Sequence, residues 1–368
     1  MQVIYDQLVY FAFFQSIFLL GIYTLSPSSR KNVNGYLAFL IFVLLIGLSS
    51  RVLYTLEAFE GNYRITAFSE YATLLFGPTV YLFTKSSLSD ERFTYQNLLH
   101  YLPALFYITF LLFYYQLPDI EVINTRVISG ELFQVVAILI GISLSVNITY
   151  WILSLQYFLK FKARLLSELS YTVKTQFFFN FLMAVGICLF AWTIIYFISI
   201  LEIERLEIEA RKFIWMSIAF IILFIAFYGI RAPELFKNKP LVVIQKYAQS
   251  KYSTTDLVNL KARLEAIMIE KQPYLNSKLL KAELAEMLGI NNPELARLLN
   301  EQIGMNFFEF VNYYRIKAFI ELAKTEKAQN MTLFGLAQEV GFNSKTTFTN
   351  AFKRLMGTTP SQYFKANS

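Results

Sequence analysis

The chain has 368 residues, of which 56% are hydrophobic and only 16% are charged. Soluble domains carry charge on roughly 25% of their positions, so much of this chain must face something other than water. The formal net charge is +7; residues 1–235 hold 15 basic and 15 acidic side chains, and residues 236–368 hold 18 and 11. A basic final third indicates a polyanionic partner. The single cysteine, Cys188, excludes disulfides and cysteine-based metal sites.

Apolar runs of membrane-spanning length fill the first part of the chain. A helix that crosses about 30 Å of hydrocarbon needs about 20 residues. Seven runs approach or reach this length: residues 8–25, 36–56, 65–83, 98–115, 132–155, 177–201 and 213–230. The sequence therefore predicts a seven-helix transmembrane bundle over residues 1–235, with the two termini on opposite sides of the bilayer.

Basic residues beside the predicted spans indicate their orientation, because Lys and Arg are enriched in cytoplasmic loops. If the C-terminus is cytoplasmic, the inner segments carry 11 Lys and Arg side chains and the outer segments carry 6. We therefore expect a multi-pass protein with its N-terminus outside and its C-terminus in the cytoplasm.

A few polar residues in the predicted bundle are candidates for a role. Glu70 is expected about one turn inside the third span and Glu131 at the mouth of the fifth, where each is either functional or an ordinary solvated group. His100, the only histidine, is expected to cap the fourth span. Gly77-Pro78 should kink the third span. The four glutamates of residues 202–209 either end a solvated helix or sense a cation, and nothing else in the loops supports the second alternative.

No catalytic motif occurs in the sequence, because Walker, nucleophile-elbow, kinase and zinc signatures are all lacking. We therefore predict no enzymatic activity and no cofactor or metal. Pro233 and Pro240 end the last span and lead into a junction over residues 236–256. Asp256 should then cap a short helix. Its apolar stripe either packs on the next domain or forms a dimer seam, and the first is favoured because about two to three turns are too short for a coiled coil.

Two similar units make up residues 257–368. They share a small residue, a glycine turn and two later apolar positions: Leu284-Ala285, Gly289-Ile290, Leu295 and Leu299 in the first, and Leu336-Ala337, Gly341-Phe342, Phe348 and Phe352 in the second. The offset is 52 residues before the turn and 53 after it. Each unit is predicted to be a helix-turn-helix, in which the glycine serves the turn. The chain is therefore predicted to be all-α, with a transmembrane bundle followed by a soluble domain.

Each predicted recognition helix has residues that can cap it. Asn292, followed by Pro293, is expected to cap the first, and Asn343 or Ser344 the second. The faces of these helices opposite the apolar positions are polar and partly basic, as a helix that enters the major groove requires.

Residues 257–364 resemble the AraC/XylS family of transcriptional regulators. The resemblance rests on the second unit, in Gly341-Phe342, Phe348, Phe352-Lys353-Arg354 and Gly357-x-x-Pro360-x-x-Tyr363. It implies that both recognition helices enter the major groove of double-stranded DNA. It also implies that residues 306–315 belong to a connecting helix on which Arg315 braces the two units. Seven-span bundles fused to this domain are known as membrane-bound AraC-like regulators in bacteria, which implies the cytoplasmic membrane as the location.

The resemblance also implies which residues contact DNA. Base readers of the family match Arg297 and Asn350, among others; arginine is the best bidentate reader of guanine, and asparagine can pair with adenine. Phosphate contacts match Lys353 and Arg354. The full predicted set is Asn292, Arg297, Asn300, Lys345, Thr346, Thr349, Asn350, Lys353 and Arg354. The stretch Pro293, Glu294 and Ala296 departs from the longer or basic side chains that are frequent in the family.

These features predict a membrane-embedded, sequence-specific regulator that couples an unidentified membrane or extracytoplasmic signal to transcription. Its expected partners are double-stranded DNA, the lipid bilayer, a signal ligand and a second copy in a homodimer. One alternative is a transporter or channel with an attached regulatory domain, but the spans hold few internal charges. Another is a constitutive DNA tether, for which one span would suffice. We expect the signal to pass through residues 233–252.

Overall fold

Regular structure in the described part of the chain is helical, apart from one isolated antiparallel bridge between Leu169 and Leu280. The computed structural model describes residues 2–25, 35–55, 64, 67–89, 94–171, 175–201, 204–231 and 254–366. The chain divides into two compact units. Residues 1–159 and 175–243 form the first unit, and residues 160–174 and 244–368 form the second.

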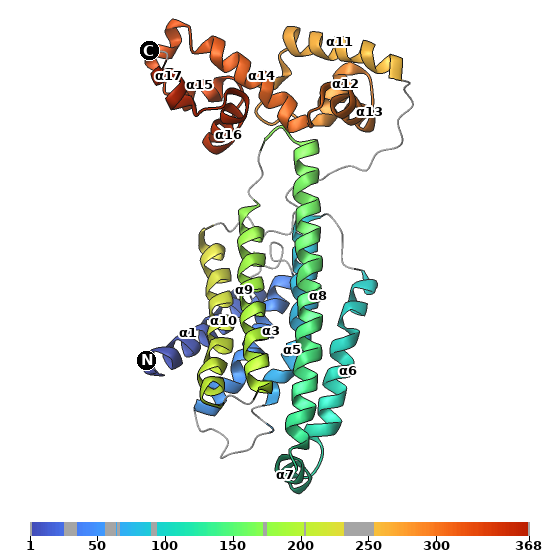
Figure 1. Ribbon diagram of the computed structural model, residues 1–368, viewed down its shortest axis with the longest axis vertical. Helices are drawn as coiled ribbons and strands as arrows, with labels where there is room; N and C mark the ends of the chain where they lie inside the picture. Colours follow the sequence, from blue (N-terminus) through green and yellow to red (C-terminus); the bar gives the residue numbers. More distant parts are fainter. Residues whose placement is uncertain are drawn as a thin grey trace. The chain divides into compact units, whose positions relative to one another are not determined.

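Each of the seven predicted spans contains a helix (Figure 1). The helices are α1 (Gln2–Leu25), α3 (Gly35–Thr55), α5 (Glu70–Leu88), α6 (Leu102–Leu111), α8 (Glu131–Glu168), α9 (Gln176–Ile200) and α10 (Glu204–Arg231). The 3-10 helix η2 (Tyr95–Tyr101) precedes α6, and the π-helix η3 (Leu112–Gln116) follows it. These two short helices extend the fourth predicted span to the length that its apolar run indicated.

Six stretches of the described helices are long and apolar enough to cross a membrane. They are Ile4–Thr24, Gly35–Leu53, Tyr95–Gln116, Glu131–Glu168, Gln176–Ile200 and Lys212–Arg231. The third predicted span, residues 65–83, is not among them. Its helix α5 starts later, at Glu70, and packs against α3 and α6. Because α5 buries many of its side chains within the unit, it needs less apolar surface than a helix that faces lipid.

A side chain of α8 reaches the backbone of α5 beside Pro78. The Asn147 Oδ1 accepts a hydrogen bond from the Gly77 N–H at 2.7 Å, and the Asn147 Nδ2 donates to the Thr73 carbonyl at 3.0 Å. These two backbone groups pair with each other in an uninterrupted α-helix. A β-carbon at Gly77 would lie 2.6 Å from the Asn147 Oδ1. Glycine at this position therefore lets α8 approach α5 and satisfy its backbone next to the proline.

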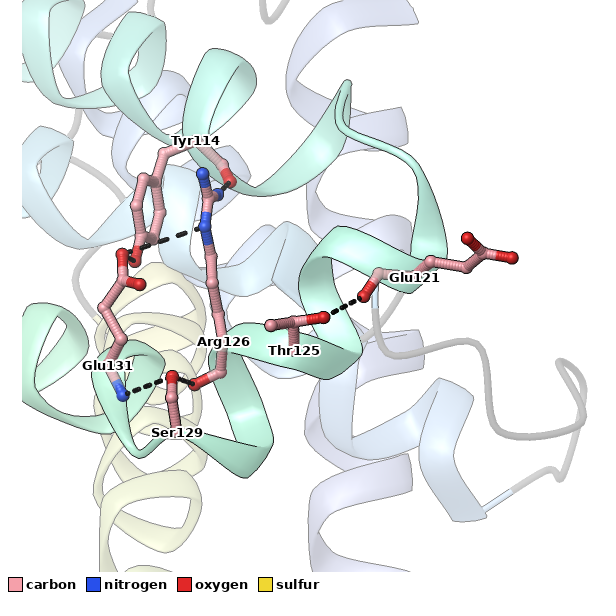
Figure 2. A network of polar contacts seen from close by, with 6 residues as sticks. All are labelled: Tyr114, Glu121, Thr125, Arg126, Ser129 and Glu131. Atoms are coloured by element: carbon pink, nitrogen blue, oxygen red, sulfur yellow. Dashed lines mark hydrogen bonds and ion pairs between the residues drawn. The ribbon is translucent and has the colours of Figure 1, made fainter.

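Two of the candidate polar residues begin helices. Glu70 is the first residue of α5 and Glu131 the first of α8. Figure 2 shows Glu131 beside Arg126, which lies on the connecting helix α7 (Ile120–Ile128). Tyr114 donates to the Glu131 carboxylate at 2.8 Å, and the Arg126 guanidinium lies 4.1 Å from the centre of the Tyr114 ring. Glu131 therefore has local partners that tie α7 to the start of α8.

The remaining candidates in this part are one histidine and two segments. The His100 Nδ1 lies 3.1 Å from the Tyr150 hydroxyl of α8, so the histidine contacts a neighbouring helix. The carboxylates of residues 202–209 fall outside the described side chains, and residues 232–253 fall outside the described residues. The route predicted for the signal, residues 233–252, is therefore not covered by the structure.

The second unit begins with the end of α8, residues 160–168. Its other helices are α11 (Thr254–Glu270), α12 (Lys281–Leu288), α13 (Asn292–Leu298), α14 (Phe307–Leu322), α15 (Leu333–Glu339), α16 (Lys345–Met356) and α17 (Pro360–Ala366). Figure 1 shows α14 joining the group α11–α13 to the group α15–α17. The connecting helix lies where the sequence predicts it.

Two separate hydrophobic clusters form the core of this unit. The first contains Leu284, Leu288, Leu295 and Leu299, and the second contains Leu336, Val340, Phe348 and Phe352. The apolar stripe of α11 is buried in the first cluster, with Leu257, Leu260, Leu264 and Met268. The stripe therefore packs on its own domain, which is the favoured alternative. The helix begins at Thr254, so Asp256 lies inside its first turn and the cap predicted there is wrong.

Candidate nucleic-acid interface

The turn of each helix-turn-helix depends on its glycine. Gly289 ends α12 with a φ of 75°, and Gly341 follows α15 with a φ of 96°. This left-handed conformation is costly for residues with a β-carbon. At Gly341 a β-carbon would also collide with the Tyr274 carbonyl oxygen. The second turn therefore needs glycine for both its conformation and its packing.

The cap of the first recognition helix differs from the prediction. Asn291, not Asn292, caps α13: its Oδ1 accepts from the Glu294 N–H at 3.0 Å, and the Glu294 carboxylate accepts from the Asn291 N–H at 2.8 Å. Such a reciprocal pair requires a spacing of three residues, and only Asn291 has that spacing to Glu294. Asn292 is the first residue of the helix instead. In the second unit Ser344 caps α16, as one of the two predicted alternatives.

The second recognition helix, α16, separates its predicted DNA contacts from its core side. Thr347, Phe348 and Phe352 are buried. The exposed positions are Lys345, Thr346, Asn350, Lys353 and Arg354, and Thr349 is half-buried. Because most of these positions are three to four residues apart, they share one helix face. The structure thus brings all six predicted residues of this unit to the surface.

The first recognition helix, α13, places its predicted residues in different surroundings. Asn300 is exposed, on the short π-helix η6 (Leu299–Ile303) that continues α13. Arg297 is half-buried, and its Nε donates to the Glu301 carboxylate at 2.9 Å. Asn292 is buried, and its Nδ2 lies 3.5 Å from the Glu168 carboxylate. The face of α13 is therefore less open than that of α16.

A predicted phosphate contact also has an acidic partner. The Arg354 Nη1 lies 2.5 Å from the Glu309 carboxylate, which belongs to the connecting helix α14. The Arg354 side chain is exposed and that of Glu309 is partly buried, so we expect the pair to contribute only modestly to stability.

Arg315 of α14 is buried and holds several segments together. Its guanidinium donates to three backbone carbonyls: Tyr274 at 2.8 Å, Asn276 at 2.7 Å and Ser170 at 2.6 Å. It also lies 5.7 Å from the centre of the Phe342 ring, in the second helix-turn-helix. Burial lowers the pKa of Arg315 to about 10, so the side chain is charged at neutral pH. The bracing role that the resemblance implied for Arg315 matches these contacts.

Sequence reasoning missed the contribution of residues 168–170 to this unit. Ser170 is more than a hundred positions from its partners along the chain, and no motif marks it. The only signal in the sequence is the polar, charged character of residues 160–168, directly after an apolar run. That pattern shows where the span ends but not what the segment contacts.

The geometry defines a protein with two helix-turn-helix units that are joined by the helix α14. The described residues before and after these units contain no β-strand. Residues 284–366 match the family model described as "Helix-turn-helix domain". Similar proteins include an uncharacterized HTH-type transcriptional regulator of Staphylococcus aureus (strain COL), 32% identical over 83 residues, or 22% of this chain. LumQ of Photobacterium leiognathi, named as a transcriptional regulator, is 29% identical over 104 residues, or 27% of this chain.

A protein of Streptomyces lividans, named as an AraC-like transcription regulator, is 30% identical over 84 residues, or 23% of this chain. The chain spans 11%, 40% and 27% of the lengths of these three relatives, in the order given. No solved structure matches the chain. The C-terminal part of this protein is an AraC-type helix-turn-helix domain, as the sequence motifs predicted, and the described residues before it include six candidate membrane helices.

Proposed function

We propose that this protein is a membrane-embedded, sequence-specific DNA-binding regulator that couples a membrane or extracytoplasmic signal to transcription. The observation that carries the proposal is the exposed polar face of α16, in a chain whose described part includes six helices long and apolar enough to cross a membrane. Basic side chains on such a face neutralise phosphates, and Asn350 can pair with adenine. Double-stranded DNA and the lipid bilayer are the proposed partners, and a signal ligand and a second copy in a homodimer complete the hypothesis.

The length of α8 supports a cytoplasmic position for the DNA-binding domain. The helix has 38 residues, or about 57 Å at 1.5 Å per residue, which exceeds about 30 Å of hydrocarbon. The span predicted at residues 132–155 leaves a helical extension with Lys160, Lys162 and Arg164. Basic residues at the end of a span favour the cytoplasmic side. We propose an external N-terminus and a cytoplasmic C-terminus in the bacterial cytoplasmic membrane.

Genome-wide binding tests the DNA-binding proposal. The tagged full chain should occupy a set of sites that share a sequence motif, and transcripts next to those sites should change when the gene is deleted. Asn350→Ala should weaken this occupancy. Lys324→Ala is the matched control, because Lys324 lies outside the recognition helices and pairs with Glu321 at 2.7 Å. Occupancy without any shared motif would contradict sequence-specific binding.

A further inference from the structure

The end of α8 is built into the DNA-binding unit by backbone pairing. Leu169 forms the antiparallel bridge with Leu280, and the Ser170 N–H donates to the Leu279 carbonyl at 3.3 Å. The Ser170 hydroxyl donates to the same carbonyl at 2.7 Å. Leu169 and Ser170 are buried. Residues 168–170, which we name the clamp, therefore form a defined contact with the segment that precedes α12.

Glu168 directs a carboxylate at the first helix-turn-helix. Its Oε1 lies 2.6 Å from the Nζ of Lys281, and its Oε2 lies 3.5 Å from the Nδ2 of Asn292. Lys281 is the first residue of α12 and Asn292 the first of α13. In helix-turn-helix proteins the N-terminal residues of the recognition helix contact base edges, and helix N-termini contact phosphates. The carboxylate thus occupies a region that DNA approaches.

The second helix-turn-helix provides an internal comparison. With the offset of 53 residues that holds after the turn, Asn292 corresponds to Lys345. Lys345 is exposed, whereas Asn292 is buried. The same position of the recognition helix is therefore exposed in one unit and buried beside Glu168 in the other.

The hydrogen bonds of Asn292 are incomplete in this arrangement. Its Nδ2 faces Glu168, but its Oδ1 is buried without a hydrogen-bond partner. A buried polar atom without a partner is uncommon and calls for an explanation. An asparagine that reads adenine uses both amide atoms, so contact with DNA would satisfy the atom that the clamp leaves unpaired.

We propose that the clamp is an autoinhibitory contact, which holds the first helix-turn-helix in a state unsuited to DNA and opens when α8 moves. Glu168 repels phosphate, neutralises Lys281 and covers Asn292. One helix carries both Asn147, which binds the backbone of α5, and Glu168. A change in the membrane helices that displaces α8 would therefore move the Glu168 carboxylate away from Lys281 and Asn292. This inference rests on the proposed DNA-binding function.

Removal of the Glu168 charge is the first test. Glu168→Gln in the full chain, purified in detergent, should bind a fluorescein-labelled duplex of random sequence about tenfold more tightly than the wild type at low salt. Its affinity should also fall more steeply with salt, by about one phosphate contact, because Lys281 becomes available. Glu270→Gln, on the exposed end of α11, is the matched control and should leave both quantities unchanged.

A reversible cross-link is the second test and does not depend on the charge. Leu169→Cys with Leu280→Cys, in a Cys188→Ser background, should form a disulfide because antiparallel partners lie close enough. The oxidised full chain should bind the same duplex about tenfold more weakly than the reduced one, and each single cysteine variant should show no redox dependence. Equal affinity of the two forms, or failure of the pair to cross-link, overturns the clamp.

The outcomes separate the clamp from the proposed function. If the wild type and Lys353→Ala differ in DNA affinity but Glu168→Gln and the cross-link have no effect, DNA binding stands and the clamp is wrong. If the reduced protein and Glu168→Gln both fail to bind any duplex at low salt, the proposed function fails, and the clamp fails with it.

Discussion

At the scale of single residues, Arg315 is a buried cation whose hydrogen bonds go to neutral oxygens. Five of its hydrogen bonds go to backbone carbonyls, the Asn312 amide and the Ser170 hydroxyl. A guanidinium offers five donors in a fixed plane, whereas an ammonium offers three around one atom. This residue therefore acts as a structural hub for which lysine is a poor substitute.

Replacement of Arg315 should destabilise the DNA-binding domain. Arg315→Ala should cost about 3–5 kcal/mol, because several buried acceptors each lose a hydrogen bond, and Arg315→Lys about 2–3 kcal/mol. Lys317→Ala is the control, since Lys317 is exposed on the same helix. Thermal unfolding followed by circular dichroism measures the difference. If the Arg315→Lys protein were as stable as the wild type, the guanidinium would not have this structural role.

The pKa of Arg315 determines the pH range in which this residue makes the free energy of unfolding depend on pH. Burial lowers the pKa to about 10 in the folded state, from about 12.5 or more in the unfolded chain. Between these values the unfolded chain holds the proton more tightly, so stability should rise with pH across that window. Below about pH 9 both states are protonated, and Arg315 should add no pH dependence. Chemical unfolding at a series of pH values, compared with Arg315→Met, checks this.

Base contacts and phosphate contacts should respond differently to mutation. Arg297→Ala and Asn350→Ala should each cost about 1–3 kcal/mol at the cognate site and relax one position of its preference. Lys353→Ala should weaken binding to all DNA and lower the salt slope by about one. Fluorescence anisotropy with the cognate duplex and a scrambled one distinguishes the two classes. If Arg297→Ala affected both duplexes equally, Arg297 would be a phosphate contact.

At the scale of helices, the sequence predicted which segments form helices more accurately than it predicted where each helix begins and ends. Periodic apolar positions identified both helix-turn-helix units because burial follows the helical repeat. The cap at Asn291 was missed by one residue, since two neighbouring asparagines can both cap and the partner Glu294 decides between them. The helix that contains the span predicted at residues 132–155 continues to Glu168, beyond the end of its apolar run. Hydropathy detects where lipid contact stops and not where helical hydrogen bonding stops.

The contact between α5 and α8 should behave as one coupled element. Gly77→Ala would place a β-carbon 2.6 Å from the Asn147 Oδ1, and should lower the stability of the first unit by about 1–3 kcal/mol. Asn147→Ala removes that obstacle, so the double variant should lose less than the sum of the two single ones. The buried thiol of Cys188 reports unfolding through its reaction with a maleimide dye on heating. Strictly additive losses would show that the two residues act independently.

At the scale of the whole molecule, the sequence predicted domains that follow one another along the chain. The domains predicted from composition were residues 1–235, 236–256 and 257–368, and these boundaries stay a prediction. Contacts add residues 160–174 to the C-terminal unit. Sequence patterns reveal neighbours within a helix or a repeat, but Ser170 and Arg315 are separated by 145 positions. Only the folded chain brings such residues together.

A fragment of residues 241–368 should therefore fold but lack the partners that Ser170 and Glu168 supply. A synthetic peptide of residues 160–174, added in excess, should raise its melting temperature, because ligands of the folded state stabilise it by mass action. The same peptide should weaken DNA binding, because it returns the clamp to the first helix-turn-helix. A segment that only completes the fold would instead strengthen DNA binding as it stabilises the domain. The two roles thus predict opposite changes in DNA affinity in one titration.

A peptide with Glu168→Gln serves as the control: it should keep much of the stabilisation, since Leu169 and Ser170 remain, but lose most of the inhibition. Circular dichroism and fluorescence anisotropy on the same samples measure both quantities, and a joint increase in stability and DNA affinity would exclude inhibition by this segment.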